Sequence, residues 1–167
     1  PFSQLASAKN DIDLIAGCSI FFSNGGGPES VAIASRRNII KINQIPLGDQ
    51  HLNNFGIWIP KIHKIKNTDR YLSLIDICKI NLQKCDFSKE FMDKNIILDQ
   101  NQPDDILNIF IDYLKFRSNS FDEKEKSLIS KYHDLREVLN SKWGILKNKK
   151  NFIAPSFLMK YKDLIKL

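Results

Sequence analysis

The sequence predicts an α/β domain with a mostly parallel sheet and helices collected toward its C-terminal end. One observation is the stretch 18–43, where an apolar run, a glycine-rich loop, a small-residue helical pattern and a second apolar run follow one another. Such a unit gives two parallel strands joined by a right-handed crossover. The other observation is a series of amphipathic helical patterns in the second half of the chain. A length of 167 residues suits one domain with one core.

The first helix is expected over residues 3–16, with Ser3 as its cap and Gly17 where a helix commonly ends. Its inward face would carry apolar side chains, namely Leu5, Ala8, Ile12 and Ile15. A buried strand is then predicted at 20–22, a helix from Pro28 to Ala34, and a strand at 39–42.

The middle of the chain predicts shorter elements. Residues 44–55 indicate a loop, and residues 56–61 a strand or extended segment that Pro60 ends. Ser73 should cap a helix of about eleven residues whose inward side chains are Leu74, Ile77, Cys78 and Leu82. We expect a loop or a frayed continuation of this helix at 85–95, and a short strand at 96–98.

The C-terminal part predicts three helices. The first starts at Pro103 with two acids in its first turn, and its apolar stripe is Ile106, Ile109, Phe110, Tyr113 and Leu114. The second spans 122–139, with Leu128, Tyr132, Leu135 and Leu139 inward. After a polar connection at 147–152, a last helix is expected from Pro155 to Leu167. This order describes a Rossmann-like, three-layer domain spanning residues 1–167.

The loop between the first two strands has the features of an anion site. Three glycines at 25–27 let main-chain N–H groups approach a ligand closely. Pro28 suits the first helical turn, and the helix directs free N–H groups and its positive dipole end toward the loop. A phosphate or diphosphate is the usual ligand of this arrangement. A tight packing turn explains the glycines equally well. Neither the dinucleotide fingerprint nor a P-loop is present.

Charge and residue counts limit the remaining possibilities. The net charge of +6 favours an anionic ligand and is compatible with contact with a membrane surface, but the basic runs are short, and no nucleic-acid partner is expected. Cys18, Cys78 and Cys85 form no metal-binding or disulfide pattern, which indicates a reducing, cytoplasmic location. Cys18 and Cys78 would serve as small apolar fillers. No metal and no cofactor is expected, and no stretch is apolar enough to span a membrane.

Several polar residues have an open role. His51 lies in the loop at 44–55 and can bind phosphate or act as an acid or base, whereas His63 and His133 are expected to be solvated. Asp11 and Asp13 are expected to be caps or surface charges. No paired-carboxylate, Ser-His-Asp or Cys-His arrangement can be argued from the spacing.

Several stretches of the sequence resemble those of a known protein family. Residues 10–48, the runs WIPK at 58–61 and DRYLS at 69–73, and IAPSFL at 153–158 with KY at 160–161 resemble the nucleotide-sugar-binding half of GT-B glycosyltransferases from bacterial surface-carbohydrate clusters. The resemblance covers nearly the whole chain in short pieces. One departure is the run of three glycines where relatives often have Ser-Gly-Pro.

The resemblance implies half of a GT-B fold, in which the diphosphate of a sugar donor sits at the glycine loop and no metal is needed. By motif position, the residues implied in donor binding are Ser23, Asn24, Gly25, Gly26, Gly27, Pro28, Glu29 and Ser30. Glu29 would contact the ribose hydroxyls, or would simply suit the helix dipole. Asn43, Gln44 and Asp49 would line the base or sugar, or would be ordinary loop residues.

The resemblance also implies partners. The acceptor would be a glycan or a lipid-linked molecule, which places the protein in the cytoplasm or at the inner face of the membrane. The chain begins at Pro1 inside an expected helix, so we expect a fragment of a longer protein whose missing N-terminal Rossmann-like domain supplies the catalytic base. The fragment alone would then be inactive. Two alternatives are a sugar-nucleotide epimerase of the same fold and a non-catalytic nucleotide-binding module.

Overall fold

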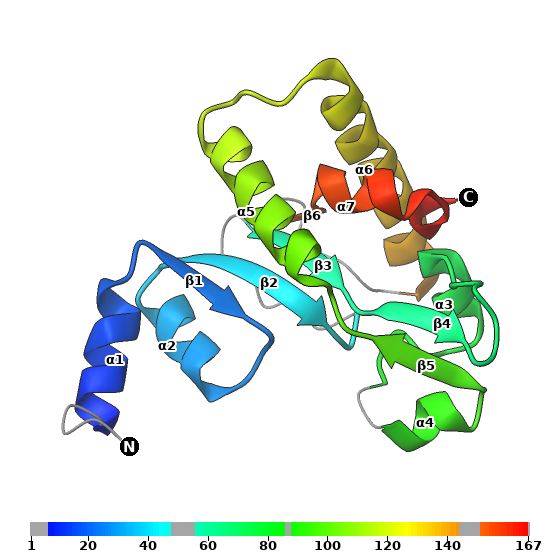
Figure 1. The fold of residues 1–167 in the computed structure, drawn as a ribbon, viewed down its shortest axis with the longest axis horizontal. Coiled ribbons are helices and arrows are strands. Elements are labelled where there is room, and N and C mark those ends of the chain that lie inside the picture. The colour runs from blue at the N-terminus through cyan, green and yellow to red at the C-terminus, as the bar shows by residue number, and fades with distance from the viewer. Residues whose placement is uncertain (1–6, 48–55, 86–87, 144–150, 167) are drawn as a thin grey trace.

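The computed structural model describes residues 7–47, 56–85, 88–143 and 151–166 (Figure 1). The strands are β1 (Ile20–Ser23), β2 (Asn38–Gln44), β3 (Gly56–Pro60), β4 (Ile62–Ile65), β5 (Ile96–Asp99) and β6 (Phe152–Ile153). The helices are α1 (Ala8–Gly17), α2 (Gly27–Ala34), α3 (Leu74–Lys79), α4 (Ser88–Met92), α5 (Pro103–Arg117), α6 (Glu123–Trp143) and α7 (Pro155–Lys160), followed by the 3₁₀ helix η1 (Lys162–Ile165).

The main sheet has four parallel strands in the order β1-β2-β3-β6, which confirms the predicted α/β class with a mostly parallel sheet. The predicted strand–helix–strand unit is β1–α2–β2, and Phe21 lies opposite Ile39 in its register. Helices cover both faces. Ser23 contacts Glu29 of α2, whereas the ring of its neighbour Phe22 meets Phe110 of α5. Because successive strand residues point to opposite faces, α2 and α5 flank the sheet.

The second sheet pairs β4 and β5 antiparallel, from Ile62 opposite Asp99 to Ile65 opposite Ile96. The strand predicted at 96–98 is therefore confirmed, but it lies outside the main sheet. Strand β4 was not predicted, because Lys61 and His63 break the apolar pattern just after Pro60. The chain leaves the main sheet at that point.

The core lies between the main sheet and the C-terminal helices. Trp58 and Ile59 of β3 are fully buried, and the Trp58 ring meets Tyr132 edge-on at 6.3 Å between centroids. Tyr132, Leu135 and Leu139 of α6 are all completely buried, as the helical period predicts. Leu74, Ile77, Cys78 and Leu82 are also buried, as expected.

The N-terminal elements are less buried than the sequence predicts. Strand β1 is an edge strand in the described part of the chain, and Phe22 is 40% exposed. None of the residues of helix α1 is buried. The helix is capped at its N-terminus by Ser7. Ile15 packs against Ala32 and Ile39, but Ile12 is exposed, so its predicted inward orientation is wrong. Ser3 and Leu5 lie outside the described residues.

Several helix bounds also differ from the expectation. Helix α3 starts after Ser73 as predicted, but it covers six residues, because the chain turns with Asn81 at a φ of 60°. The stretch at 85–95 contains the short helix α4. The last predicted helix ends at Lys160 and is followed by the 3₁₀ helix η1. Leu114, predicted to face inward, is 48% exposed because α5 turns that side to solvent.

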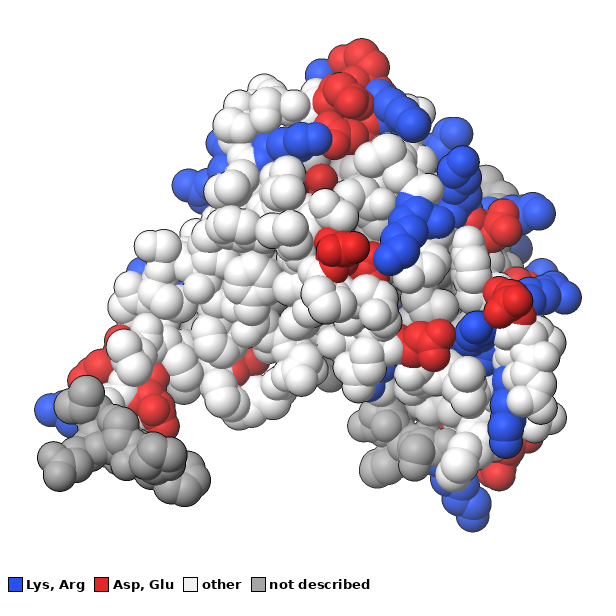
Figure 2. Space-filling view, viewed as in Figure 1, with Lys and Arg blue, Asp and Glu red and all other residues white. Residues whose placement is uncertain are grey.

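Charged side chains are unevenly distributed over the surface. Figure 2 shows few of them over β1, β2 and the middle of α5, and many over the region of β4, α6 and α7. Among the described residues, the exposed apolar side chains include Phe22, Leu107, Ile111 and Leu114. No described helix has both the length and the apolar composition required to span a lipid bilayer.

Candidate anion-binding site at the glycine loop

The glycine loop lies where β1 ends and α2 begins, at the carboxyl edge of the parallel sheet. Ligands of open α/β sheets bind at this edge. Gly25 and Gly26 both have a φ of 100°, a conformation that side-chain-bearing residues rarely adopt. Asn24 and the three glycines are exposed, so the loop faces solvent.

The main-chain N–H groups of the loop divide into two sets. Gly25 N–H donates to Ser23 Oγ at 2.9 Å, and Glu29 N–H donates to the Gly26 carbonyl at 3.1 Å. Within the described residues, no hydrogen bond uses the N–H groups of Gly26 and Gly27. These two groups stand at the N-terminus of α2, where the helix dipole favours negative charge.

The described residues leave free space around the three glycine Cα atoms of the loop. A Cβ atom built on Gly25, Gly26 or Gly27 would meet nothing within 4 Å. Pro28 occupies the first helical turn, as predicted, and both Pro28 and Ser30 are exposed. Among the described residues, none would have to move to admit a side chain at Gly25, Gly26 or Gly27.

Glu29 lies beneath the loop and is 6% exposed. Its Oε1 is 2.7 Å from Lys41 Nζ, and its Oε2 accepts a short hydrogen bond from the Ser23 hydroxyl. Both carboxylate oxygens thus have protein partners, and the predicted contact with a ribose stays a prediction. Lys41 was not predicted as a site residue, although a lysine inside the apolar run of β2 is a signal of an unusual role.

Asn43 and Gln44 end β2 at the same edge of the sheet. Asn43 exchanges hydrogen bonds with Asn101. Asn101 was not predicted as a site residue either, since nothing in its local sequence pattern distinguishes it. Gln44 is buried, and its side-chain amide donates to the Pro46 carbonyl at 3.1 Å. The structure places both residues at the carboxyl edge of the main sheet, and their predicted contact with a base or sugar stays a prediction.

The histidines differ from the expectation. His63 is 2% exposed rather than solvated, and burial lowers the pKa of its ring to about 4. His133 is half-buried, and burial lowers the pKa of its ring too. Both side chains are covered because the elements that carry them pack against the core. His51 and Asp49 lie outside the described residues.

The cysteines and the other acids have ordinary surroundings. Cys78 is buried as predicted, and burial raises the pKa of its thiol to about 12. Cys18 is only half-buried, so it does not fill the core. Asp11 and Asp13 are exposed, in line with surface charges. Among the described residues, no group of three or more His, Cys, Asp or Glu side chains is placed to hold a metal ion.

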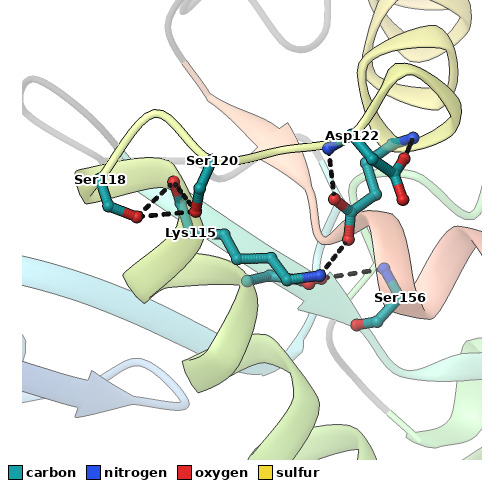
Figure 3. Close-up of polar contacts among 7 residues, drawn as sticks. Lys115, Ser118, Ser120, Asp122 and Ser156 are labelled. Atoms are coloured by element: carbon teal, nitrogen blue, oxygen red, sulfur yellow. Dashed lines mark hydrogen bonds and ion pairs between the residues drawn. The ribbon is translucent and has the colours of Figure 1, made fainter.

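A second polar cluster joins α5, α6 and α7 at their ends (Figure 3). Lys115 Nζ lies 2.6 Å from Glu125 Oε1, and Glu125 forms reciprocal hydrogen bonds with Asp122 at the start of α6. Asp112 accepts the main-chain N–H of Ser156 at 2.9 Å. These contacts satisfy helix N-termini and hold the helices together, so we assign the cluster a structural role.

Comparison with known proteins adds no assignment. No protein-family model, no curated protein and no solved structure matches this chain significantly. The glycine loop and its surroundings are therefore the basis for inferring the function.

Proposed function

We propose that this chain is the donor-binding domain of a metal-independent glycosyltransferase, which transfers a sugar from a nucleoside-diphosphate donor to a glycan or lipid-linked acceptor. The observation that carries the proposal is the pair of N–H groups on Gly26 and Gly27, for which the described residues provide no acceptor, at the N-terminus of α2 and the carboxyl edge of a parallel sheet. Such groups bind phosphate oxygens well, because the N–H dipoles and the helix dipole act together.

The chemistry of glycosyl transfer fits this arrangement. The leaving group is a nucleoside diphosphate, and negative charge develops on its oxygens as the bond to the sugar breaks. Fixed N–H donors stabilise that charge without reorganising. In this proposal the acceptor site and the catalytic base come from the second Rossmann-like domain, and the chain by itself binds the donor without transferring the sugar.

Gly27 offers a sharp test of the site. Its φ lies outside the strained positive range, and a Cβ at this position has open space. Gly27→Asp should therefore fold, since an acid in the first helical turn also suits the dipole. Its carboxylate would repel a bound diphosphate, whereas the isosteric Gly27→Asn carries no charge.

The measurement is the melting temperature with UDP-, GDP-, ADP- and CMP-sugars, followed by calorimetric affinity for any ligand that raises it. We expect a shift with one nucleotide class, a loss of affinity of about tenfold or more in Gly27→Asp, and a much smaller loss in Gly27→Asn. Equal binding by the wild type and Gly27→Asp, or no binding by the wild type, would contradict the proposal.

The epimerase alternative has a separate readout. The chain would be incubated without acceptor with the sugar nucleotide that it binds. Release of free nucleoside diphosphate together with a 2-epimeric sugar would identify an epimerase. Binding with no turnover is the result expected of a donor-binding domain.

A further inference from the structure

Lys41 occupies an unusual place for a lysine. It lies in the second strand of the main sheet, with Ser23 of β1 and Trp58 of β3 as its neighbours across the sheet. Its side chain is 3% exposed. An ammonium group in such a position is costly unless it is paired. Its partner is Glu29 at 2.7 Å, in the first turn of α2.

The pair is connected to the glycine loop through one serine. Lys41 holds Oε1 of Glu29, and Oε2 of Glu29 accepts the Ser23 hydroxyl proton. Since that proton points at Glu29, the lone pairs of Ser23 Oγ are free to accept the N–H of Gly25. The contact turns Gly25 N–H inward, and no acceptor in the described part of the chain takes the N–H groups of Gly26 and Gly27.

The Lys41–Glu29 pair also leaves no net charge beneath the loop. An unpaired Glu29 carboxylate, one turn from the loop, would oppose an incoming anion in a poorly screened environment. Lys41 neutralises it, so that the positive end of the α2 dipole decides the local potential. A buried Lys–Glu pair is weak evidence for stability as such. Its position beneath the loop points to a role in the loop's conformation and charge.

We propose that Lys41 and Glu29 are positioning residues: through Ser23 they fix the glycine loop with the Gly26 and Gly27 N–H groups presented to a diphosphate. The inference rests on the proposed donor-binding function. It assigns Glu29 a place under the ligand rather than in contact with the ribose.

The test uses a double variant, Lys41→Met/Glu29→Leu, because removing one partner alone would leave a buried charge unpaired and can prevent folding. Leu, unlike Gln, has no oxygen that could accept the Ser23 hydroxyl. The matched control is Lys115→Met/Glu125→Leu, which removes an ion pair with a 2.6 Å contact from the polar cluster at the ends of α5 and α6. The probe is inorganic pyrophosphate, the part common to nucleoside diphosphates, with affinity measured by calorimetry. Amide hydrogen exchange of Gly25 supplies a second readout that needs no ligand.

We expect the Lys41→Met/Glu29→Leu protein to fold, to bind pyrophosphate at least tenfold more weakly, and to exchange the Gly25 amide faster than the wild type. The control variant should keep its affinity within about twofold, whatever its melting temperature. Ser23→Ala should reproduce the loss, and Ser23→Thr, which keeps the hydroxyl, should restore most of the affinity.

The outcomes separate this inference from the proposed function. If the wild type binds pyrophosphate and the double variant binds it equally well, the positioning role is overturned and the donor site stands. Unchanged Gly25 exchange in the double variant also overturns it. If the wild type binds neither pyrophosphate nor any sugar nucleotide, the donor site itself is refuted, and the positioning role with it.

Discussion

Asn43 and Asn101, 58 positions apart in the chain, exchange two hydrogen bonds. The Asn43 main-chain N–H donates to Asn101 Oδ1 at 2.5 Å, and the Asn101 main-chain N–H donates to Asn43 Oδ1 at 2.7 Å. The Asn101 side-chain amide also donates to the Pro60 carbonyl at 2.8 Å. One buried asparagine therefore joins the ends of β2 and β3 to the start of α5, beside the edge of the sheet where the glycine loop lies.

Asn101→Ala should lower the free energy of unfolding by about 2 kcal/mol, because the Asn43 N–H and the Pro60 carbonyl lose their side-chain partner in a buried place. Urea denaturation measures this. Asn108→Ala, at an exposed position of α5, serves as the control and should change stability by less than about 0.5 kcal/mol. Equal effects of the two substitutions would show that the Asn43–Asn101 contact does not stabilise the fold.

His63 should make the protein acid-sensitive. Its ring is buried against Phe91, and its Nδ1 lies 3.1 Å from the Lys61 carbonyl. Burial lowers the pKa of His63 from 6.5 to about 4, so the unfolded chain takes up a proton first as the pH falls. The stability contribution is present above pH 6.5 and is lost as the pH falls toward 4, by about 3 kcal/mol.

The check is urea denaturation between pH 4 and pH 7. In His63→Gln this pH dependence should largely disappear, even if the variant is less stable at neutral pH. An unchanged slope in His63→Gln would rule out His63 as its source.

Asp112 should act in the opposite direction. Burial raises the pKa of its carboxyl group, although the contact with Ser156 works against this. The folded protein therefore binds the Asp112 proton first as the pH falls. The contribution is fully present below the unfolded pKa of 3.8 and is lost as the pH rises through the raised value.

Asp112→Asn keeps an oxygen that accepts the Ser156 N–H but cannot ionise. Relative to the wild type, its free energy of unfolding should increase as the pH rises from 4 to 7. Asp104→Asn, at an exposed site on the same helix, should show no such trend. A pH-independent difference between Asp112→Asn and the wild type would refute the raised pKa.

Two aliphatic positions of α5 should respond differently to the same change. Ile109 is completely buried and Leu114 is 48% exposed, although both belong to the apolar stripe predicted from the sequence. Ile109→Ala should cost about 2–5 kcal/mol, because it leaves a cavity in the core. Leu114→Ala should cost less than about 1 kcal/mol. Thermal or chemical denaturation of the two variants measures these changes in the free energy of unfolding. Similar losses of stability in both variants would contradict the orientation of α5.

The sequence alone supports a good part of the fold. The unit β1–α2–β2 was predictable because its signals are local: two apolar runs, a glycine loop and Pro28 at the helix start. The same holds for the Ser73 cap and for the buried face of α6, where the helical period places Tyr132, Leu135 and Leu139 together.

The candidate site was predictable only in part. The glycine loop can be recognised in the sequence from its three consecutive glycines, and the structure places it at the carboxyl edge of a parallel sheet. The partners of Glu29 and Asn43 were not predictable, since Lys41 and Asn101 reach them from other elements. Pairing between elements is set by how they pack, and single-sequence periodicity carries no record of it.

By itself, then, the sequence determined which residues are apolar, where helices start and where the glycines free the backbone. Only the tertiary structure decided which apolar faces are covered: Phe22 on the edge strand β1 and Leu114 on α5 are exposed, while His63 is buried. The physical reason is that burial depends on the neighbour that arrives from elsewhere in the chain. A buried lysine such as Lys41 is tolerable only once Glu29 has been brought against it.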